Sequence, residues 1–187
     1  MKLTYLFTAV LASSSALASP LAAVHVKRDA AAVVDAVNTI GTSLVTLNTT
    51  VTGYSGGLGS ELTALKIELE SSQLVRDLKD AISTTQQSAN FTDAESGTVA
   101  TALVTLEPQI LSALTNIASK KAAFEKGILD FISLTFLVKN NLQQQKDLSA
   151  QLGDAVTAKL TPNYASLAPL ITGQIADAFT AAINTFD

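Results

Sequence analysis

Apolar residues recur along most of the chain with the three- and four-residue spacing of amphipathic helices. The clearest case begins at Asp29 and continues to about Thr52. Its apolar positions step by four and three: Val33, Val37, Ile40, Leu44, Leu47, Val51 and Tyr54. This spacing places them on one face of a helix and favours packing in an antiparallel bundle. The first helix is therefore predicted over residues 29–52.

A second helix is predicted to begin at Ser60-Glu61, after a glycine-rich connection over residues 53–60. Its apolar residues form two stripes, Leu58, Leu62, Leu65 and Leu69, followed by Val75, Leu78 and Ile82. The gap of six positions between the stripes does not hold one helical face. A bend or a shift of phase is therefore expected near Ser71-Ser72, and the polar run 83–90 is expected to end the helix.

The third helix has a clear start signal. Thr92 and Glu95 form a capping box, in which the threonine hydroxyl caps the helix and the glutamate reaches back to it. The stripe that follows consists of Val99, Leu103, Leu106, Ile110, Leu114 and Ile117. Pro108 interrupts this stripe, and because proline removes one backbone hydrogen bond, a kink or a helix in two parts is expected there.

The most apolar stretch runs from Ile128 to Val138, where eight of the eleven residues are large and apolar. On a helix they would point in every direction, and a helix that is apolar all round is buried. Eleven residues span about 16 Å of helix, too little to cross a membrane. A buried strand is the alternative. The helix-forming residues on both sides favour a core helix that continues to about Leu152.

The last helix is predicted to begin at Thr161-Pro162, read as N-cap and first helical residue, or at Ser166 with Pro169 in the first turn. Its apolar face carries Leu167, Ile171, Ile175, Phe179 and Phe186. With no strand pattern, the predicted fold class is all-α: an antiparallel bundle of about five helices with an apolar interior. Because large side chains are few and Ala, Thr and Ser are many, this interior leaves room for a lumen of lipid size.

The N-terminal segment has the pattern of a secretory signal peptide. Lys2 precedes an apolar run from Leu3 to Leu11, and Ala16-Leu17-Ala18 is a small-x-small cleavage site. An ordinary N-terminal helix is the alternative. The prediction is a secreted, extracellular protein without a transmembrane segment, since the apolar run is too short for a membrane anchor.

A dibasic pair, Lys27-Arg28, follows the signal and suggests a second cleavage that leaves Asp29 as the first mature residue; two surface charges are the alternative. The predicted organisation is a signal peptide at 1–18, a short pro-segment at 19–28 and one helical domain at 29–187.

The mature chain would keep nine of the 12 basic residues and all 16 acidic ones, a net charge of −7. An acidic surface disfavours nucleic acid as a partner.

Residues 29–187 contain no His, Cys, Trp or Met. Ser-His-Asp and Cys-His catalysis are therefore excluded, as are zinc sites built from His and Cys, haem and iron–sulfur ligation. No enzymatic activity, cofactor or metal is expected.

Asn48 and Asn90 lie in Asn-x-Thr sequons, which makes them candidate N-glycosylation sites in a secreted chain.

Candidate ligand-lining residues are taken from two helical faces, that of the third helix and that of the predicted core helix. They are Leu103, Leu106, Ile110, Leu114, Ile128, Phe131, Ser133, Leu134, Thr135 and Phe136. Ser133 and Thr135 have two interpretations. Their hydroxyls could bond to backbone carbonyls four residues back, or they could face the lumen and hold a polar head group.

Several short motifs resemble the fungal hydrophobic surface binding protein A family, which includes the cell-wall galactomannoprotein antigens. They are Phe91-Thr92-Asp93-Ala94-Glu95-Ser96, the segment 98–103, Pro108-Gln109-Ile110, and Lys120-Lys121 with Phe124. The resemblance covers about residues 29–186 and implies a secreted fungal five-helix bundle that binds fatty acids or related lipids and adsorbs to hydrophobic surfaces. Ser/Thr-rich extensions and an anchor signal, common in wall-bound members, are missing, which favours free secretion.

Two functional hypotheses follow. The first is a non-enzymatic binder of a fatty acid or other lipid, held in the lumen by burial of about 0.8 kcal/mol per methylene. The alternative is a cell-wall or surface-adsorbing mannoprotein, a glycoprotein that coats hydrophobic surfaces and recruits a secreted hydrolase. The second hypothesis requires no cavity.

Overall fold

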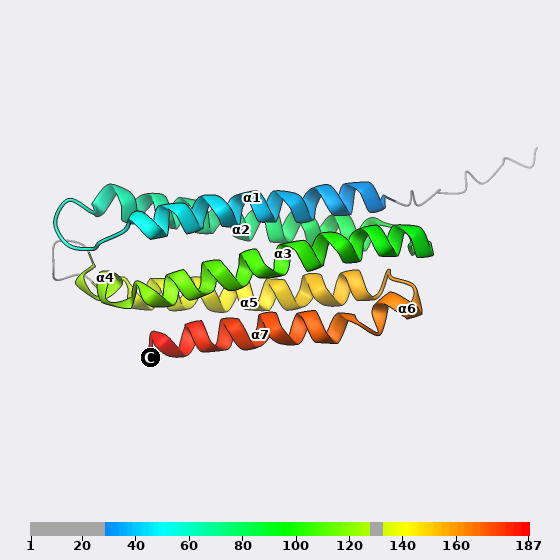
Figure 1. The fold of residues 1–187 in the computed structure, drawn as a ribbon. Helices are drawn as coiled ribbons and strands as arrows, with labels where there is room; N and C mark the ends of the chain where they lie inside the picture. Colours follow the sequence, from blue (N-terminus) through cyan, green and yellow to red (C-terminus); the bar gives the residue numbers. More distant parts are fainter. Residues whose placement is uncertain (1–28, 128–132) are drawn as a thin grey trace, which may run out of the picture.

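The computed structural model describes residues 29–127 and 133–187, which form five long helices and two short ones (Figure 1). The helices are α1 (Ala30–Gly53), α2 (Glu61–Gln87), α3 (Asp93–Ser119), α4 (Lys121–Lys126), α5 (Thr135–Thr157), α6 (Pro162–Ala165) and α7 (Ala168–Thr185). No strand is present in these two ranges, which confirms the all-α prediction. The predicted signal peptide and pro-segment lie outside the described residues.

The five long helices form a closed ring in which each packs mainly against two others. Helix α1 contacts α2 and α3, α5 contacts α2 and α7, and α7 closes the ring against α3. Consecutive long helices run antiparallel, as Figure 1 shows. The predicted five-helix antiparallel bundle is therefore confirmed, and its apolar faces meet along a common axis.

Helix α1 provides the most completely buried face of the ring. All seven residues of its predicted apolar stripe are buried, and Val33 and Val51 are fully inaccessible to solvent. Asp29 caps the helix by accepting a hydrogen bond from the Ala32 amide at 3.0 Å. The start and the inward face of α1 are thus both encoded locally in the sequence.

Helix α3 begins with the predicted capping box. The Thr92 amide donates to Glu95 Oε2 at 2.7 Å, and the Glu95 amide donates to Thr92 Oγ1 at 3.4 Å. The helix continues through Pro108 to Ser119, so the predicted division into two helices is wrong. Leu106 and Ile110, on either side of the proline, are buried, and this packing holds both halves in one helix.

Helix α2 is continuous from residue 61 to residue 87, and its first leucine stripe faces solvent instead of the core. Leu58, Leu62, Leu65 and Leu69 are 74%, 81%, 56% and 61% exposed. The buried face carries Ser71 and Asp77, which have polar partners in the ring: Ser43 donates to Asp77 Oδ2 at 2.5 Å. Because these polar residues are paired, burying them fixes the helix rotation that turns the leucines outward.

The predicted core helix over residues 128–152 is confirmed from Thr135 onward, where it forms most of α5. Residues 128–132 lie outside the described residues, α4 ends at Lys126, and α5 begins only at Thr135. Gly127 has a φ of 56°, a left-handed conformation that ends α4. The first turn of α5 lies at the end of the bundle, where only one side of the helix meets the ring. Phe136 is consequently 75% exposed.

The last predicted helix is divided in two. The short α6 begins at Pro162, and α7 begins separately at Ala168, with Leu167 as its N-cap residue. Pro169 occupies the first turn of α7, one of the two predicted arrangements.

Among the described residues, three segments are long and apolar enough, by composition alone, to cross a membrane: Ala30–Gly53, Asp93–Ser119 and Pro162–Thr185. Only part of each segment is buried in the bundle, and Pro162–Thr185 is buried least. The absence of a transmembrane segment stays a prediction.

The glycine-rich connection between α1 and α2 is held against the α3–α4 end of the bundle by hydrogen bonds and an aromatic contact. The Gly57 amide donates to the Gly127 carbonyl at 3.0 Å. Tyr54, at the C-cap of α1, stacks on Phe124 with ring centroids 5.0 Å apart and donates to the same carbonyl at 3.3 Å. Burial raises the pKa of the Tyr54 phenol. These contacts give the loop one defined course.

Gly56 of this loop leaves no room for a side chain. It has a φ of 71°, and a Cβ there would lie 2.2 Å from the Ala123 carbonyl oxygen. Gly59 has a φ of 86°, but a Cβ there would contact nothing within 4 Å. We expect Gly59→Ala to cost about 1–2 kcal/mol of unfolding free energy, the backbone cost alone. Gly56→Ala should cost clearly more in urea unfolding, and equal costs would contradict the close approach.

Candidate functional site

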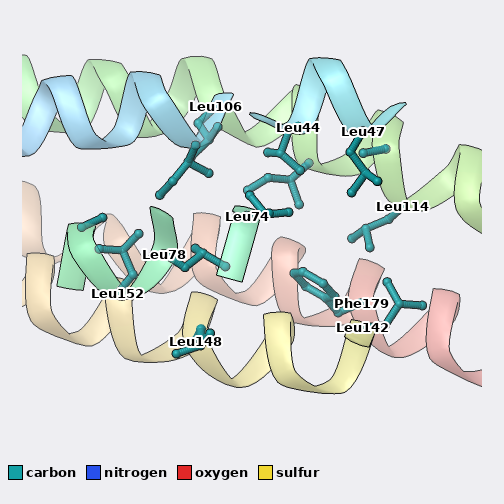
Figure 2. Packing of buried hydrophobic residues seen from close by; sticks show 14 of the residues in the cluster. Leu44, Leu47, Leu74, Leu78, Leu106, Leu114, Leu142, Leu148, Leu152 and Phe179 are labelled. Atoms are coloured by element: carbon teal, nitrogen blue, oxygen red, sulfur yellow. The ribbon is translucent and has the colours of Figure 1, made fainter. Parts of the chain in front are cut away.

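The closed ring encloses an axial cavity of about 450 Å³. All five long helices line it, with apolar side chains on each: Ile40, Leu44 and Leu47 on α1; Leu74 and Leu78 on α2; Leu103, Leu106, Ile110 and Leu114 on α3; Leu152 and Val156 on α5; Ile171, Ile175 and Phe179 on α7. Figure 2 shows the labelled leucines of α1, α2 and α3 pointing toward Phe179 and the leucines of α5.

The cavity is elongated along the bundle axis. Its lining on α5 begins at Gln145 and reaches Leu160 beyond the end of the helix, a span of about 22 Å at 1.5 Å per residue. One end is bordered by Tyr164 and Leu167, beside α6. At the other end lie Ile117, Gln145 and Phe179. This shape fits an extended chain better than a compact ligand.

The wall formed by α7 is packed less tightly than the other walls. Its buried residues, Phe179, Ala182 and Ile183, all lie in its C-terminal half. Near its N-terminus, Leu167 and Leu170 are 59% and 66% exposed. With Val104 of α3, which is 53% exposed, Leu167 forms an apolar border where the cavity meets the surface. We refer to this end, beside α6, as the mouth.

Polar groups are few in the cavity. Gln145 is the one lining residue that is both polar and buried within the described ranges, at 4% exposure. Lys146 also borders the cavity, but its Nζ donates to Thr180 Oγ1 at 2.9 Å. Among the described residues, no group of His, Cys, Asp or Glu could hold a metal ion. The lining is therefore suited to binding an apolar ligand.

The predicted ligand-lining residues fall into four groups. Those on α3, Leu103, Leu106, Ile110 and Leu114, all line the axial cavity. Leu134 instead lines a separate cavity of about 40 Å³, with Phe124 and Leu142 among its neighbours. Ile128 and Phe131 lie outside the described residues. A role of any of these residues in ligand binding remains a prediction.

The other three predicted residues lie away from both cavities. Ser133 Oγ and Thr135 Oγ1 are 2.8 Å apart and bond to each other, which neither interpretation of these hydroxyls anticipated. Phe136 points into solvent. The part of α5 that lines the axial cavity is therefore not its first turn, as predicted, but the residues from Gln145 onward.

Sequence reasoning missed the walls supplied by α5 and α7. Leu152 and Val156 lie four residues apart on α5, and Ile171, Ile175 and Phe179 recur at the same spacing on α7. This periodicity identifies an inward face on each helix. It does not say which inward faces border a void, because that depends on how the ring closes.

The two sequons occupy different surroundings. Asn90 is exposed in the loop between α2 and α3. Asn48 lies within α1, where its Oδ1 accepts a hydrogen bond from Asn116 Nδ2 of α3 at 2.7 Å. A glycan is sterically easier to place at Asn90, and glycosylation of either residue remains a prediction.

The family model described as hydrophobic surface binding protein A matches residues 30–158. The structure is similar to that of AfMp4p in complex with palmitic acid, with a TM-score of 0.79 and 26% identity, covering 85% of this chain and 100% of that one. It is also similar to ligand binding domain 2 of the Penicillium marneffei MP1 protein complexed with multiple arachidonic acids, with a TM-score of 0.74 and 22% identity, covering 86% and 97%. No curated protein sequence matches the chain.

Two phenylalanines test the placement of the cavity wall. Phe179 is 4% exposed and borders the cavity, whereas Phe136 is 75% exposed. We expect Phe179→Ala to lower the unfolding free energy by about 3 kcal/mol or more, because it removes a buried ring. Phe136→Ala should change it by less than about 0.5 kcal/mol in the same urea titration. A large loss in Phe136→Ala would mean that the first turn of α5 packs into the bundle.

Proposed function

Since the chain belongs to the hydrophobic surface binding protein A family, we propose that it binds a fatty acid or related lipid in the axial cavity without catalysing a reaction. The observation that carries this proposal is a cavity of about 450 Å³ lined by apolar side chains from all five long helices. Its volume is within the range of about 300–1,000 Å³ usual for small-molecule sites. The palmitic acid and arachidonic acid complexes of structurally similar proteins support the same ligand class.

Burial of the chain supplies the binding free energy. A dozen methylenes at about 0.8 kcal/mol each contribute roughly 10 kcal/mol before the cost of association is subtracted. This gain requires no strong polar contact, in keeping with the scarcity of polar lining groups. Affinity should therefore increase with chain length until the cavity is filled.

The position of the carboxylate follows from the cost of burying charge. An isolated carboxylate inside an apolar cavity is strongly disfavoured unless a cation pairs with it. Lys146 is the one basic residue among the described lining residues, and its ammonium group is directed to Thr180. The carboxylate therefore stays at the mouth, near Tyr164, where water reaches it. The acyl chain extends inward toward Phe179.

Secretion is part of the proposal and is supported by the signal-like segment 1–18 and the dibasic pair at 27–28. The described fold begins directly after that pair, where Asp29 caps α1. Cleavage after Arg28 would leave Asp29, the cap of α1, as the first residue.

A matched pair of substitutions on α7 tests the cavity. Ala176 lines it, whereas Ala181, five residues later, is exposed and does not. Ala176→Phe should fill the lumen and weaken palmitic acid binding by at least about tenfold, or about 1.4 kcal/mol. Ala181→Phe should bind like the wild type. Native mass spectrometry and calorimetry of delipidated protein provide the measurement, and unchanged binding in Ala176→Phe would exclude this cavity as the site.

A second function, adsorption to hydrophobic surfaces, is favoured by the leucine stripe of Leu58, Leu62, Leu65 and Leu69. These four side chains are between 56% and 81% exposed on one side of the α2 region. A contiguous apolar patch of this kind marks an interaction surface. None of the four lines the axial cavity, so adsorption and lipid binding could operate independently. Recruitment of a secreted hydrolase rests on the family resemblance alone.

The two functions are separable by mutation. We expect the triple variant Leu62→Gln/Leu65→Gln/Leu69→Gln to lose most of its adsorption to polystyrene beads, measured as depletion from solution, and to keep wild-type affinity for palmitic acid. Val45→Gln serves as the control, because Val45 is 55% exposed on α1, away from the stripe. Equal adsorption of the triple variant and the control would rule out the stripe as the adsorbing face.

A further inference from the structure

The inner end of the cavity contains a buried amide that an acyl chain does not explain. Gln145 lies in the middle of α5, between the buried Leu142 and Leu148, and is itself 4% exposed. With Leu47 and Ile117, it lines both the axial cavity and the adjoining cavity of about 40 Å³. It therefore stands where the large cavity closes, at the end opposite the mouth.

The hydrogen bonds of Gln145 are incomplete. Its Nε2 donates to Ser71 Oγ of α2 at 2.9 Å, and Ser71 is 5% exposed. Its Oε1 has no partner among the described residues. A glutamine amide carries two donors and two acceptor lone pairs, so this side chain keeps both an acceptor and a donor for a further group.

A purely structural role accounts poorly for this arrangement. Asp77, the comparable buried polar residue between α1 and α2, has both carboxylate oxygens occupied: Ser43 donates to Oδ2 and Gln73 Nε2 donates to Oδ1 at 2.7 Å. Most buried polar groups that hold helices together are satisfied in this way. Glu70 Oε2 and Gln109 Oε1 also lack a partner, but neither residue lines the axial cavity. Gln145 has one bond and faces a void large enough to hold a ligand.

The chemistry of this end selects an uncharged group. The fatty acid carboxylate is placed at the mouth, so the question is which group its other end carries. No buried cation lines the axial cavity within the described residues, so a carboxylate at that other end would be left unpaired. A hydroxyl can both donate to the Oε1 of Gln145 and accept from its Nε2, and it carries no charge. The lining spans about 22 Å from Gln145 to the mouth, so one long chain can place its carboxylate at the mouth and its far end at Gln145.

We propose that Gln145 is a recognition site for the terminal hydroxyl of an ω-hydroxy fatty acid bound in the axial cavity. The site rests on the proposed lipid-binding function and deepens it by naming the ligand class. The carboxylate lies at the mouth, the methylenes lie along the leucines, and the hydroxyl pairs with the amide. Without Gln145, the same hydroxyl would be buried unpaired, and the cavity would reject it.

The test compares palmitic acid with ω-hydroxyhexadecanoic acid, which has the same chain length, by calorimetry on delipidated protein. Wild type should bind the two acids with Kd values within about threefold of each other. Gln145→Met has nearly the same volume and no amide. Relative to palmitic acid, it should bind the hydroxy acid at least about tenfold more weakly than the wild type does.

Each other outcome has a distinct meaning. If Gln145→Met weakens both acids by the same factor, or neither, the amide has only a structural role and the hydroxyl site is overturned. If wild type binds neither acid, the proposed lipid-binding function fails, and this site fails with it. Palmitic acid binding together with rejection of the hydroxy acid by wild type overturns the hydroxyl site alone.

A wild-type measurement covers the case in which Gln145→Met does not fold. The methyl ether of the hydroxy acid, ω-methoxyhexadecanoic acid, keeps the oxygen and lacks the O–H donor. Wild type should bind it at least about tenfold more weakly than the hydroxy acid. Heptadecanoic acid and octadecanoic acid, whose chains have as many heavy atoms as the hydroxy acid and the ether respectively, control for added length. Equal affinities of ether and hydroxy acid would contradict donation to Oε1.

Discussion

The closure of five helices into one ring is the constraint on which the rest of the structure depends. Each long helix packs mainly against two neighbours, so no helix occupies the axis and side chains alone must fill it. Leucines, isoleucines and alanines leave about 450 Å³ unfilled. An empty space of that size costs on the order of 10 kcal/mol by the relation found for core cavities. This is comparable with the whole stability of a domain, so the acyl chain proposed above would have a large stabilising role.

Local signals in the sequence determine where the helices begin and which face of α1 and α3 is buried. The Asp29 cap and the Thr92–Glu95 capping box were predictable because they depend on residues within one turn. The rotation of α2 was not, because buried Ser71 and Asp77 pair with residues far away in the sequence. A hydrophobicity pattern rates those two as exterior and the four leucines as interior, the reverse of their positions.

Of the walls of the candidate site, the sequence predicted the one on α3 but not those on α5 and α7. The α3 wall follows from one regular stripe. The second wall was predicted in the run 128–138, whose described residues do not line the axial cavity. Apolar composition was high there, but Gly127 breaks the helix and Phe136 points outward. The walls that α5 and α7 supply carry ordinary apolar periodicity. Only the order of helices around the ring shows that these faces border a void.

Helix α7 stands apart from the other four long helices in one respect. The family model ends at residue 158, before α7 begins, yet this helix supplies one wall of the cavity through Ile171, Ile175 and Phe179. Only three of its residues are buried. The family pattern thus covers four of the five long helices that line the cavity, and the fifth lies beyond it. Because few side chains of α7 are buried, substitutions on this helix can change the size and chemistry of the cavity while the other four helices keep their mutual contacts.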